Sequence, residues 1–192
     1  MGRLTLYLAT RNRNKFLEAS RILEGAPIDL RMLEVDKEEL QADDTEVIAL
    51  HAARRIHMET GLPVVVDDTG LFINSLGGFP GPYAEYVYRT IGLEGVLRLL
   101  EGASDRRACF KTSLALVTTG HEQVFNGVTC GIITREIRGS GGFGYDPIFM
   151  PEGYSRTYAE MSLEEKNRVS HRGKAFRELA RWAERVVGGQ GD

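Results

Sequence analysis

Three consecutive valines, Val64, Val65 and Val66, are followed at once by two aspartates, Asp67 and Asp68. A short, fully apolar run is typical of a strand that is buried on both faces in the middle of a sheet. Successive side chains of a strand point to opposite faces, so we expect one aspartate to face a cleft and the other to support it. The carboxyl edge of an open α/β sheet is where such sheets bind ligands. A turn built from Asp, Thr and Gly is the alternative.

The amino-terminal segment has the order strand, polar loop, helix. Leu4–Ala9 is apolar, residues 10–15 are polar, and apolar residues then recur from Phe16 at helical spacing. This order directs free backbone amides and the positive end of a helix dipole out of the sheet edge, where an anion is favoured. Lys15 adds a positive charge. The glycines of known phosphate-binding loops are missing, so a solvated helix cap rich in Asn and Arg is the alternative.

Strand and helix patterns alternate along the rest of the chain. Strands are expected at 28–33, 107–118 and 123–136, and helices at 45–59, 84–91 and 93–100. This alternation is typical of an α/β fold. With 192 residues and a mass of 21.4 kDa, the chain is predicted to form one domain over residues 1–187, followed by a frayed tail at 188–192.

The stretch from residue 139 to 174 combines glycines, aromatic rings and charges. Its glycines leave the backbone free to adopt positive φ and let a ligand approach main-chain amides. Asp146 precedes Pro147, which biases the aspartate to an extended conformation, so we expect an exposed carboxylate fixed beside Phe143 and Tyr145. We therefore expect the active site here. For the glycines alone, an ordinary turn between strands is the alternative.

A helix junction follows in the same stretch. Ser162 and Glu165 have the spacing of a capping box, which predicts that a short helix carrying Lys166 starts there. Residues 170–173 interrupt that helix before an amphipathic run begins. Lys166, His171 and Arg172 are thus expected to cluster at the junction. Taken alone, His171 fits a capping role better than a functional one.

The net charge of the chain indicates what kind of molecule it binds. The formal net charge is -3 and no Lys/Arg-rich block occurs, which argues against a nucleic-acid partner and favours a small ligand. No apolar run suits a membrane span or a signal peptide, so a soluble, cytoplasmic protein is expected. Cys109 and Cys130 lie in apolar, strand-like runs without metal or redox spacing, so buried free thiols are expected.

Four blocks stand in one order along the chain. They are Thr-x-Asn-x-x-Lys from Thr10, Asp-Asp-Thr-Gly from Asp67, Gly-Gly-Phe-Pro-Gly-Pro-Tyr from Gly77, and Phe-Gly-Tyr-Asp-Pro from Phe143 followed by Ser-His-Arg from Ser170. In these blocks the chain resembles the inosine/xanthosine triphosphate pyrophosphatase family. The resemblance implies a Mg²⁺-dependent hydrolase that converts nonstandard purine nucleoside triphosphates (ITP, dITP, XTP) to the monophosphate and pyrophosphate. It also implies an elongated mixed sheet with flanking helices, two lobes around a central cleft, and a homodimer.

The same resemblance assigns the site residues. Glu39 and Asp68 would hold Mg²⁺, and Asp68 and Lys15 would be catalytic. The substrate-binding residues that it implies are Thr10, Arg11, Asn12, Arg13, Asn14, Lys15, Thr69, Phe143, Gly144, Tyr145, Asp146, Lys166, His171 and Arg172. Thr10, Asn12 and Lys15 would hold the triphosphate, and Phe143 would stack on the purine. Donors such as Arg172 would pair with a 6-oxo group and leave the 6-amino group of adenine unpaired.

The chain departs from the family pattern at several positions, and two rival functions stay open. Arg11 stands where a glycine is common in the family, and Thr69 replaces a commoner serine. The helix from Glu46 lacks the Asn or Lys of many relatives, so His51 and Arg55 are only candidates for a phosphate contact. The rival functions are a pyrophosphatase for modified pyrimidine nucleotides and a nucleotide-binding sensor that does not hydrolyse its ligand.

Overall fold

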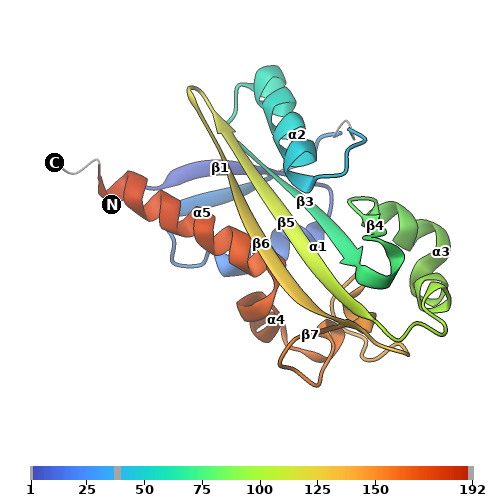
Figure 1. The fold of residues 1–192 in the computed structure, drawn as a ribbon. Coiled ribbons are helices and arrows are strands. Elements are labelled where there is room, and N and C mark those ends of the chain that lie inside the picture. Colours follow the sequence, from blue (N-terminus) through green and yellow to red (C-terminus); the bar gives the residue numbers. More distant parts are fainter. Residues whose placement is uncertain (1, 37–39, 190–192) are drawn as a thin grey trace.

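A computed structural model describes residues 2–36 and 40–189, which contain one mixed, seven-stranded sheet (Figure 1). Its strands are β1 (Leu4–Ala9), β2 (Ile28–Leu33), β3 (Val64–Ile73), β4 (Pro80–Gly81), β5 (Arg107–Thr118), β6 (His121–Ile133) and β7 (Phe149–Pro151). The order across the sheet is β2-β1-β3-β5-β6-β7, with β4 paired to β3. β1 is parallel to β2 and β3, and the other pairs are antiparallel. The α/β class with a mixed sheet and flanking helices is confirmed, and the two-lobed shape stays a prediction.

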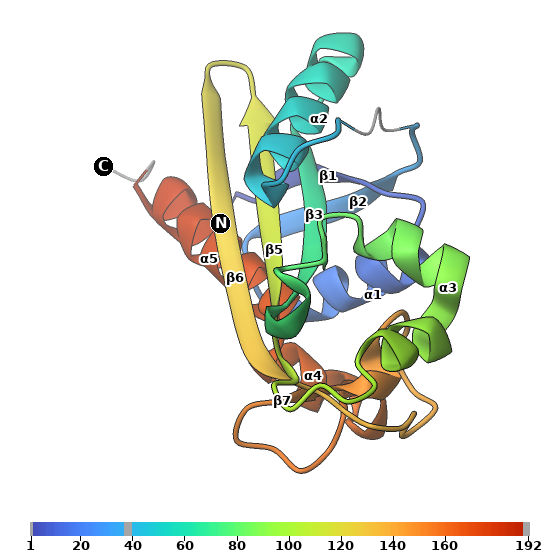
Figure 2. The same ribbon diagram turned by 45° about the vertical axis from the view of Figure 1, so that its right-hand side comes forward.

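The described residues also form five α-helices, which cover both faces of the sheet (Figure 2). They are α1 (Arg13–Ile22), α2 (Thr45–Thr60), α3 (Ala84–Leu99), α4 (Leu163–Val169) and α5 (His171–Gly188). α1 and α5 share one core with Val65, whereas α2 packs against Val64 and Val66 on the opposite face. Alternate valines of β3 therefore serve two cores, as the two-residue repeat of a strand requires. No helix among the described residues is long and apolar enough to span a membrane.

A third hydrophobic core lies at the open end of the β5–β6 hairpin, opposite to its turn. There, α3 and residues 145–161 pack against the ends of β3 and β5. Phe110 of β5 is central to this core, with its ring centroid 4.8 Å from that of Phe149 and 6.4 Å from that of Tyr158. This core brings the segment that carries Tyr145 beside the second half of β3.

Local capping sets several helix ends, as predicted. Ser162 accepts a hydrogen bond from the backbone N–H of Glu165, and the Glu165 side chain accepts one from the N–H of Ser162, so the capping box of α4 is present. Ser170 then ends α4 and caps α5 by accepting from the N–H of Gly173 at 3.0 Å. Gly92, with φ of 67°, separates α3 into the two expected helical segments.

Other element boundaries differ from the prediction. β3 does not end at the aspartates but continues to Ile73, because β5 pairs with it along its whole length. β1 pairs with β3 only as far as Val65, so the aspartates lie beyond that partner. β6 begins at His121 and ends at Ile133, instead of spanning 123–136. α5 includes Gly188, which was expected in the tail, and residues 190–192 lie outside the described part of the chain.

The expectation of buried free thiols is wrong. Cys109 and Cys130 are partners in the β5–β6 register and form a disulfide. Cys109 is half-buried and Cys130 is exposed. The two cysteines are 21 residues apart, a spacing without a local signal, and only the antiparallel register brings them within bonding reach.

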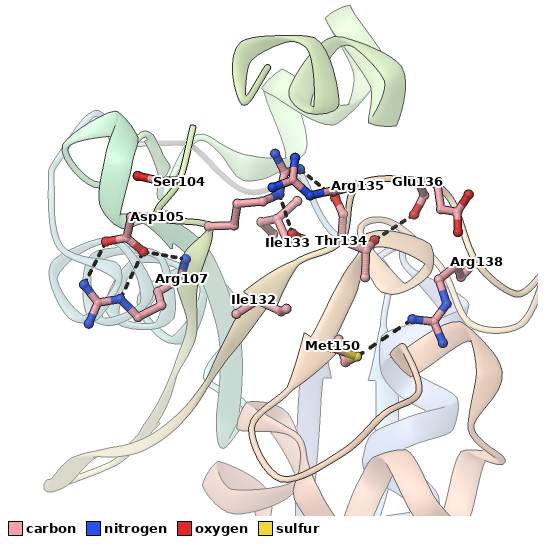
Figure 3. Close-up of a pocket in the computed structure, with 11 residues that line it drawn as sticks. Ser104, Asp105, Arg107, Ile132, Ile133, Thr134, Arg135, Glu136, Arg138 and Met150 are labelled. Carbon is pink, nitrogen blue, oxygen red and sulfur yellow. Dashed lines mark hydrogen bonds and ion pairs between the residues drawn. The ribbon is translucent and has the colours of Figure 1, made fainter. Parts of the chain in front are cut away.

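A cavity of about 690 Å³ lies at the end of the hairpin, away from the predicted site (Figure 3). Two of its arginines already have partners. Arg107 is bonded to Asp105, and Arg106 donates to three backbone carbonyls. No predicted site residue that the structure describes lines this cavity. The candidate site is therefore elsewhere, around β3 and α5.

Candidate active site

The two aspartates of β3 have opposite environments, as the strand repeat predicts. Asp67 is buried on the side of α1 and α5, where its carboxylate accepts from Lys15 Nζ at 2.6 Å and from Arg172 Nε at 2.8 Å. Asp68 is half-buried and lines a cavity together with Ile48 of α2. Asp67 thus supports the site, and Asp68 faces the cavity.

Asp67 belongs to a buried set of ion pairs in which acidic and basic side chains alternate. Arg172 Nη1 donates to Glu18 Oε2 at 2.6 Å, and Lys166 Nζ donates to Glu18 Oε1 at 2.6 Å and to Asp146 Oδ2 at 2.5 Å. Glu18, Lys166 and Arg172 are 3%, 3% and 2% exposed. Buried charges are tolerated only when they are paired, so these side chains hold one another in place.

Burial and neighbouring charges have opposite effects on the pKa values of Glu18, Asp67 and Asp146. Burial raises the pKa of Glu18, but Arg172 and Lys166 outweigh burial and hold the pKa below its ordinary value. The same competition holds the pKa of Asp67 far below its ordinary value. At Asp146 burial prevails over Lys166, and the pKa is raised. Of the three acids, Asp146 is therefore the one that binds a proton most readily.

The expectation of an exposed Asp146 is wrong. The residue is 4% exposed, and besides Lys166 it accepts from the backbone N–H of Phe143 at 2.9 Å. Gly142 has a φ of 68°, and a Cβ there would meet Asp146 Oδ2 at 1.9 Å, so the turn requires glycine. The carboxylate of Asp146 therefore shapes the turn that presents Phe143.

A cavity of about 80 Å³, the base cavity, opens beside these charges. Phe143 forms part of its wall, with Lys166 Nζ 4.6 Å and Arg172 Cζ 5.6 Å from the ring centroid. The hydroxyl of Tyr145 donates to the carbonyl of Ala84 at 2.7 Å, which ties this wall to α3. An aromatic wall with a few convergent polar groups is suited to a flat, polar ring.

His171 lines the base cavity from the first turn of α5. It is 3% exposed, and its ring stacks on Phe110 with the centroids 4.5 Å apart. Burial, together with Arg172 and Lys166, lowers the pKa of His171 well below its ordinary value, so the ring is neutral at pH 7. Its Nδ1 is buried and has no hydrogen-bond partner within residues 2–36 and 40–189.

A second cavity of about 530 Å³ adjoins the first. The second is called the phosphate cavity and the first the base cavity, after the parts of a nucleotide that the family resemblance predicts there. Lys15, Thr69 and Glu85 belong to the walls of both cavities. Its other lining residues include Thr10, Arg11, Asn12, Asp36, Gln41, Asp68, Tyr83, Tyr86 and Arg89. A long ligand can extend from the base cavity into the phosphate cavity past the three shared residues.

This arrangement occurs in a chain whose residues 6–182 match the Ham1 family. The chain belongs to the Ham1 family. A dITP/XTP pyrophosphatase from Pyrobaculum aerophilum is 56% identical over 93% of this chain and 96% of that protein. A dITP/XTP pyrophosphatase from Hyperthermus butylicus is 46% identical over 92% of this chain and 93% of that protein.

Solved Ham1 structures have the same fold. A HAM1 protein from Coxiella burnetii has a TM-score of 0.79 and 34% identity, covering 92% of this chain and 96% of its own. The Ham1 protein from Staphylococcus aureus has a TM-score of 0.81 and 28% identity, covering 94% and 98%. The family resemblance stated from the sequence blocks is confirmed.

Most of the predicted residues of this Ham1 family member come together. Those in the base cavity are Lys15, Thr69, Phe143, Gly144, Tyr145, Asp146, Lys166, His171 and Arg172. Those in the phosphate cavity are Thr10, Arg11, Asn12, Asp68 and again Lys15 and Thr69. Arg13 and Asn14 are exposed in the first turn of α1 and line neither cavity. The roles of these residues in binding and catalysis stay predictions.

The loop after β1 is a capped helix start. Asn12 Oδ1 accepts from the backbone N–H groups of Asn14 and Lys15 at 3.0 and 3.2 Å, and the N–H of Asn12 donates to Thr10 Oγ1 at 3.0 Å. The expectation of free amides is therefore wrong for these three groups. The loop still offers an anion the positive end of α1 and the ammonium group of Lys15.

The phosphate cavity has the ligand chemistry of a hard cation. Asp68, Asp36 and Glu85 line it and carry oxygen ligands. Among the described residues, no group of three or more His, Cys, Asp or Glu could hold a metal ion. Mg²⁺ takes one or two protein carboxylates and fills its other positions with water and phosphates, and the Mg²⁺ site stays a prediction. Glu39, the other predicted ligand, lies outside the described residues.

Glu18 is a site residue that the sequence analysis missed. It lies on α1, three positions after Lys15, and joins Lys166 and Arg172, which are 148 and 154 positions away. The available signal was a carboxylate next to Ala19 on the buried side of a helix. Acids are almost never fully buried unless they are paired, so such a position predicts a cationic partner.

Proposed function

We propose that this chain hydrolyses nonstandard purine nucleoside triphosphates, ITP, dITP and XTP, to the monophosphate and pyrophosphate. The observation that carries the proposal is the pair of adjoining cavities, one aromatic with buried charges and one lined by Lys15 and carboxylates. Membership of the Ham1 family supports the same activity, as do relatives named dITP/XTP pyrophosphatase.

The base cavity is suited to a 6-oxopurine. Arg172 donates to Asp67, Glu18 and Thr69, which uses three of the five N–H groups of a guanidinium and leaves two. A 6-oxo group accepts from such donors, whereas the 6-amino group of adenine is itself a donor. A polar mismatch of this kind, fully desolvated, is worth a factor of roughly 10⁴. Neutral His171 adds a second polar group for the base edge.

The phosphate cavity is suited to the triphosphate. Lys15 donates to Asp67 and retains further N–H groups for the charge that develops on the leaving pyrophosphate. Asp68 orients or deprotonates the attacking water, and Asp68 with Glu39 would hold Mg²⁺, which supplies charge neutralisation at the phosphates. Attack on the α-phosphorus forms one P–O bond and breaks the bond to the bridging oxygen, which leaves with the pyrophosphate.

One experiment tests reaction and specificity together. The purified protein is incubated with Mg²⁺ and ITP, and in parallel with ATP and a modified pyrimidine triphosphate, and the products are separated by chromatography with a pyrophosphate assay. We expect IMP and pyrophosphate from ITP and little product from the others. IDP with phosphate would contradict the mechanism, and a preference for the pyrimidine would favour the first rival. Binding without any product would favour the sensor.

The homodimer and the cytoplasmic location also stay predictions, as does the single domain over residues 1–187. Exposed apolar side chains on β6, Val128 and Ile132, are compatible with a partner surface. Light scattering gives the test of the dimer, for which we expect twice the chain mass of 21.4 kDa. A mass that stays at one chain over the working concentration range would exclude the dimer there.

A further inference from the structure

The base and phosphate cavities meet at Lys15, Thr69 and Glu85. In a nucleoside triphosphate the sugar joins the base to the phosphates. A base in one cavity and a triphosphate in the other therefore require the sugar to lie against these three residues. The inference that follows rests on the proposed function, because that function supplies this pose.

Two of the three shared side chains already have partners. Lys15 Nζ donates to Asp67 at 2.6 Å. Thr69 Oγ1 donates to Asp67 Oδ1 at 3.1 Å and lies 2.7 Å from Thr112 Oγ1. The side chain of Glu85 is exposed and makes no hydrogen bond or ion pair with the residues that the structure describes. Glu85 is thus the shared group that is available to a ligand.

The fold sets the position of Glu85. It lies in the first turn of α3, directly after Ala84, which is 5% exposed and accepts from the Tyr145 hydroxyl at 2.7 Å. The beginning of α3 is therefore tied to the wall of the base cavity. Burial and then the charge of Glu85 raise the pKa of Tyr145, which agrees with a carboxylate close to that wall.

The chemistry of Glu85 selects the part of the nucleotide that it contacts. An ionised carboxylate can only accept hydrogen bonds. Phosphate oxygens are acceptors with the same sign of charge, so the available donors at the junction are sugar hydroxyls. Relatives of this chain are named for dITP and XTP. These two nucleotides differ in the base and at the 2′-position of the sugar, and both retain a 3′-hydroxyl.

We propose that Glu85 accepts a hydrogen bond from the 3′-hydroxyl of the bound nucleotide and so fixes the sugar between the two cavities. Glu85 is then a determinant of sugar recognition that acts independently of the base. It selects against nucleotides without a 3′-hydroxyl and does not separate ribonucleotides from 2′-deoxyribonucleotides.

The test removes the residue and the hydroxyl separately and together. Wild type and Glu85→Ala are each assayed with ITP, dITP and 2′,3′-dideoxy-ITP. In wild type we expect kcat/KM for the dideoxy nucleotide to be lower on the order of tenfold, the scale of one net hydrogen bond to a charged group. Relative to wild type, we expect Glu85→Ala to have a kcat/KM lower by the same factor with dITP and an unchanged kcat/KM with the dideoxy nucleotide. With dITP, the kcat/KM of Glu85→Gln is expected to lie between those of wild type and Glu85→Ala, because glutamine keeps an acceptor oxygen.

Glu94→Gln is the matched control, because Glu94 is an exposed carboxylate later in α3 and lines neither cavity. We expect it to match wild type. The proposal is overturned if Glu85→Ala lowers kcat/KM equally with dITP and the dideoxy nucleotide. It is also overturned if the substitution raises kcat/KM with both or leaves kcat/KM unchanged. A changed ratio of ITP to dITP overturns it too, because the contact would then be to the 2′-hydroxyl.

The failure of the proposed function is recognised separately. If wild type releases no pyrophosphate from any of these nucleotides, that function is wrong. Calorimetric binding of dIMP and 2′,3′-dideoxy-IMP to wild type and Glu85→Ala then still tests the sugar contact. Equal dissociation constants for the two monophosphates in wild type would overturn it.

Discussion

Asp67 and Asp68 are the same residue type at adjacent positions, yet the structure gives them different environments. Asp67 is 2% exposed and bonded to Lys15 and Arg172, whereas Asp68 is half-buried in the wall of the phosphate cavity. The alternation of side chains along β3 is the cause. This difference supports the proposal that Asp68 carries out the chemistry and that Asp67 holds neighbouring side chains in place.

Asp68→Asn should fold like wild type and lose turnover. We expect kcat with ITP and Mg²⁺ to fall by about 10²- to 10⁴-fold, because a positioned general base contributes that much. Circular dichroism checks the fold. Asp43→Asn, which removes an exposed carboxylate that lines neither cavity, is the control and should leave kcat unchanged. An unaltered kcat in Asp68→Asn would remove Asp68 from the mechanism.

Glu18→Gln should destabilise the protein while hardly changing its shape. The substitution leaves Lys166 and Arg172 with one buried carboxylate fewer. Breaking a buried pair by removing one partner costs roughly 3 to 5 kcal/mol, which urea denaturation measures. Glu24→Gln is the matched control, because Glu24 is exposed and its pair with Arg21 is on the surface. A loss below about 1 kcal/mol in Glu18→Gln would show that its charge is dispensable.

At the scale of elements, the β5–β6 hairpin joins the parts of the molecule. It pairs with β3 along one edge, carries Phe110 into the third core, and supports α5 on one face. Gly127 of β6 permits the close approach of α5, because a Cβ there would meet the carbonyl oxygen of His171 at 1.9 Å. The hairpin therefore determines where α5 presents His171 and Arg172.

The disulfide between Cys109 and Cys130 should stabilise this hairpin. Closing a loop of this length restricts the unfolded chain and contributes about 3 kcal/mol. We expect the double variant Cys109→Ser, Cys130→Ser to lose about that much free energy of unfolding. Reductant should lower the stability of wild type by a similar amount and leave the variant unchanged. Wild type that is reduced by thiol labelling yet equally stable would contradict this prediction.

At the scale of the whole molecule, three hydrophobic cores pack around the sheet, and a set of buried charges lies among α1, α4 and α5. Two cores lie on opposite faces of the sheet and the third lies at the end of the hairpin. The charges of Glu18, Lys166 and Arg172 close the space where α1, α4 and α5 converge. A change in the protonation of side chains in this region therefore changes the free energy of unfolding of the whole protein.

Stability should fall on acidification through the range in which His171 would titrate. Burial lowers its pKa well below 6.5, so below pH 6.5 the unfolded state binds a proton that the folded state does not. The free energy of unfolding then falls by up to about 1.4 kcal/mol per pH unit as the pH drops below that value. Urea denaturation at several pH values between 7.5 and 5.5 measures this slope.

His171→Asn provides the comparison. Asp146 acts in the opposite direction, because its pKa is raised in the folded state and acid therefore favours the fold at that group. Since Asp146 is present in both proteins, the difference between their pH profiles isolates His171. Parallel profiles would mean that His171 has the same pKa in the folded and the unfolded protein.

Local signals in the sequence predicted much of the fold. The valine run, the helix break at Gly92 and the capping box of Ser162 and Glu165 all occur where expected. The opposite orientation of the two aspartates was likewise predictable. These features depend on contacts within a few residues, whose geometry the spacing of side chains and the caps determine.

The four sequence blocks also identified the family, and most of the site residues predicted from that resemblance line the two cavities. The blocks did not reveal that Asp146 is buried, that Glu18 joins Lys166 to Arg172, or that Cys109 and Cys130 pair. These features depend on residues 20 to 154 positions apart. The sequence by itself determined the elements and the kinds of side chain at the site. Only tertiary packing decided which charges are taken out of water, because burial and partner depend on segments that meet after folding.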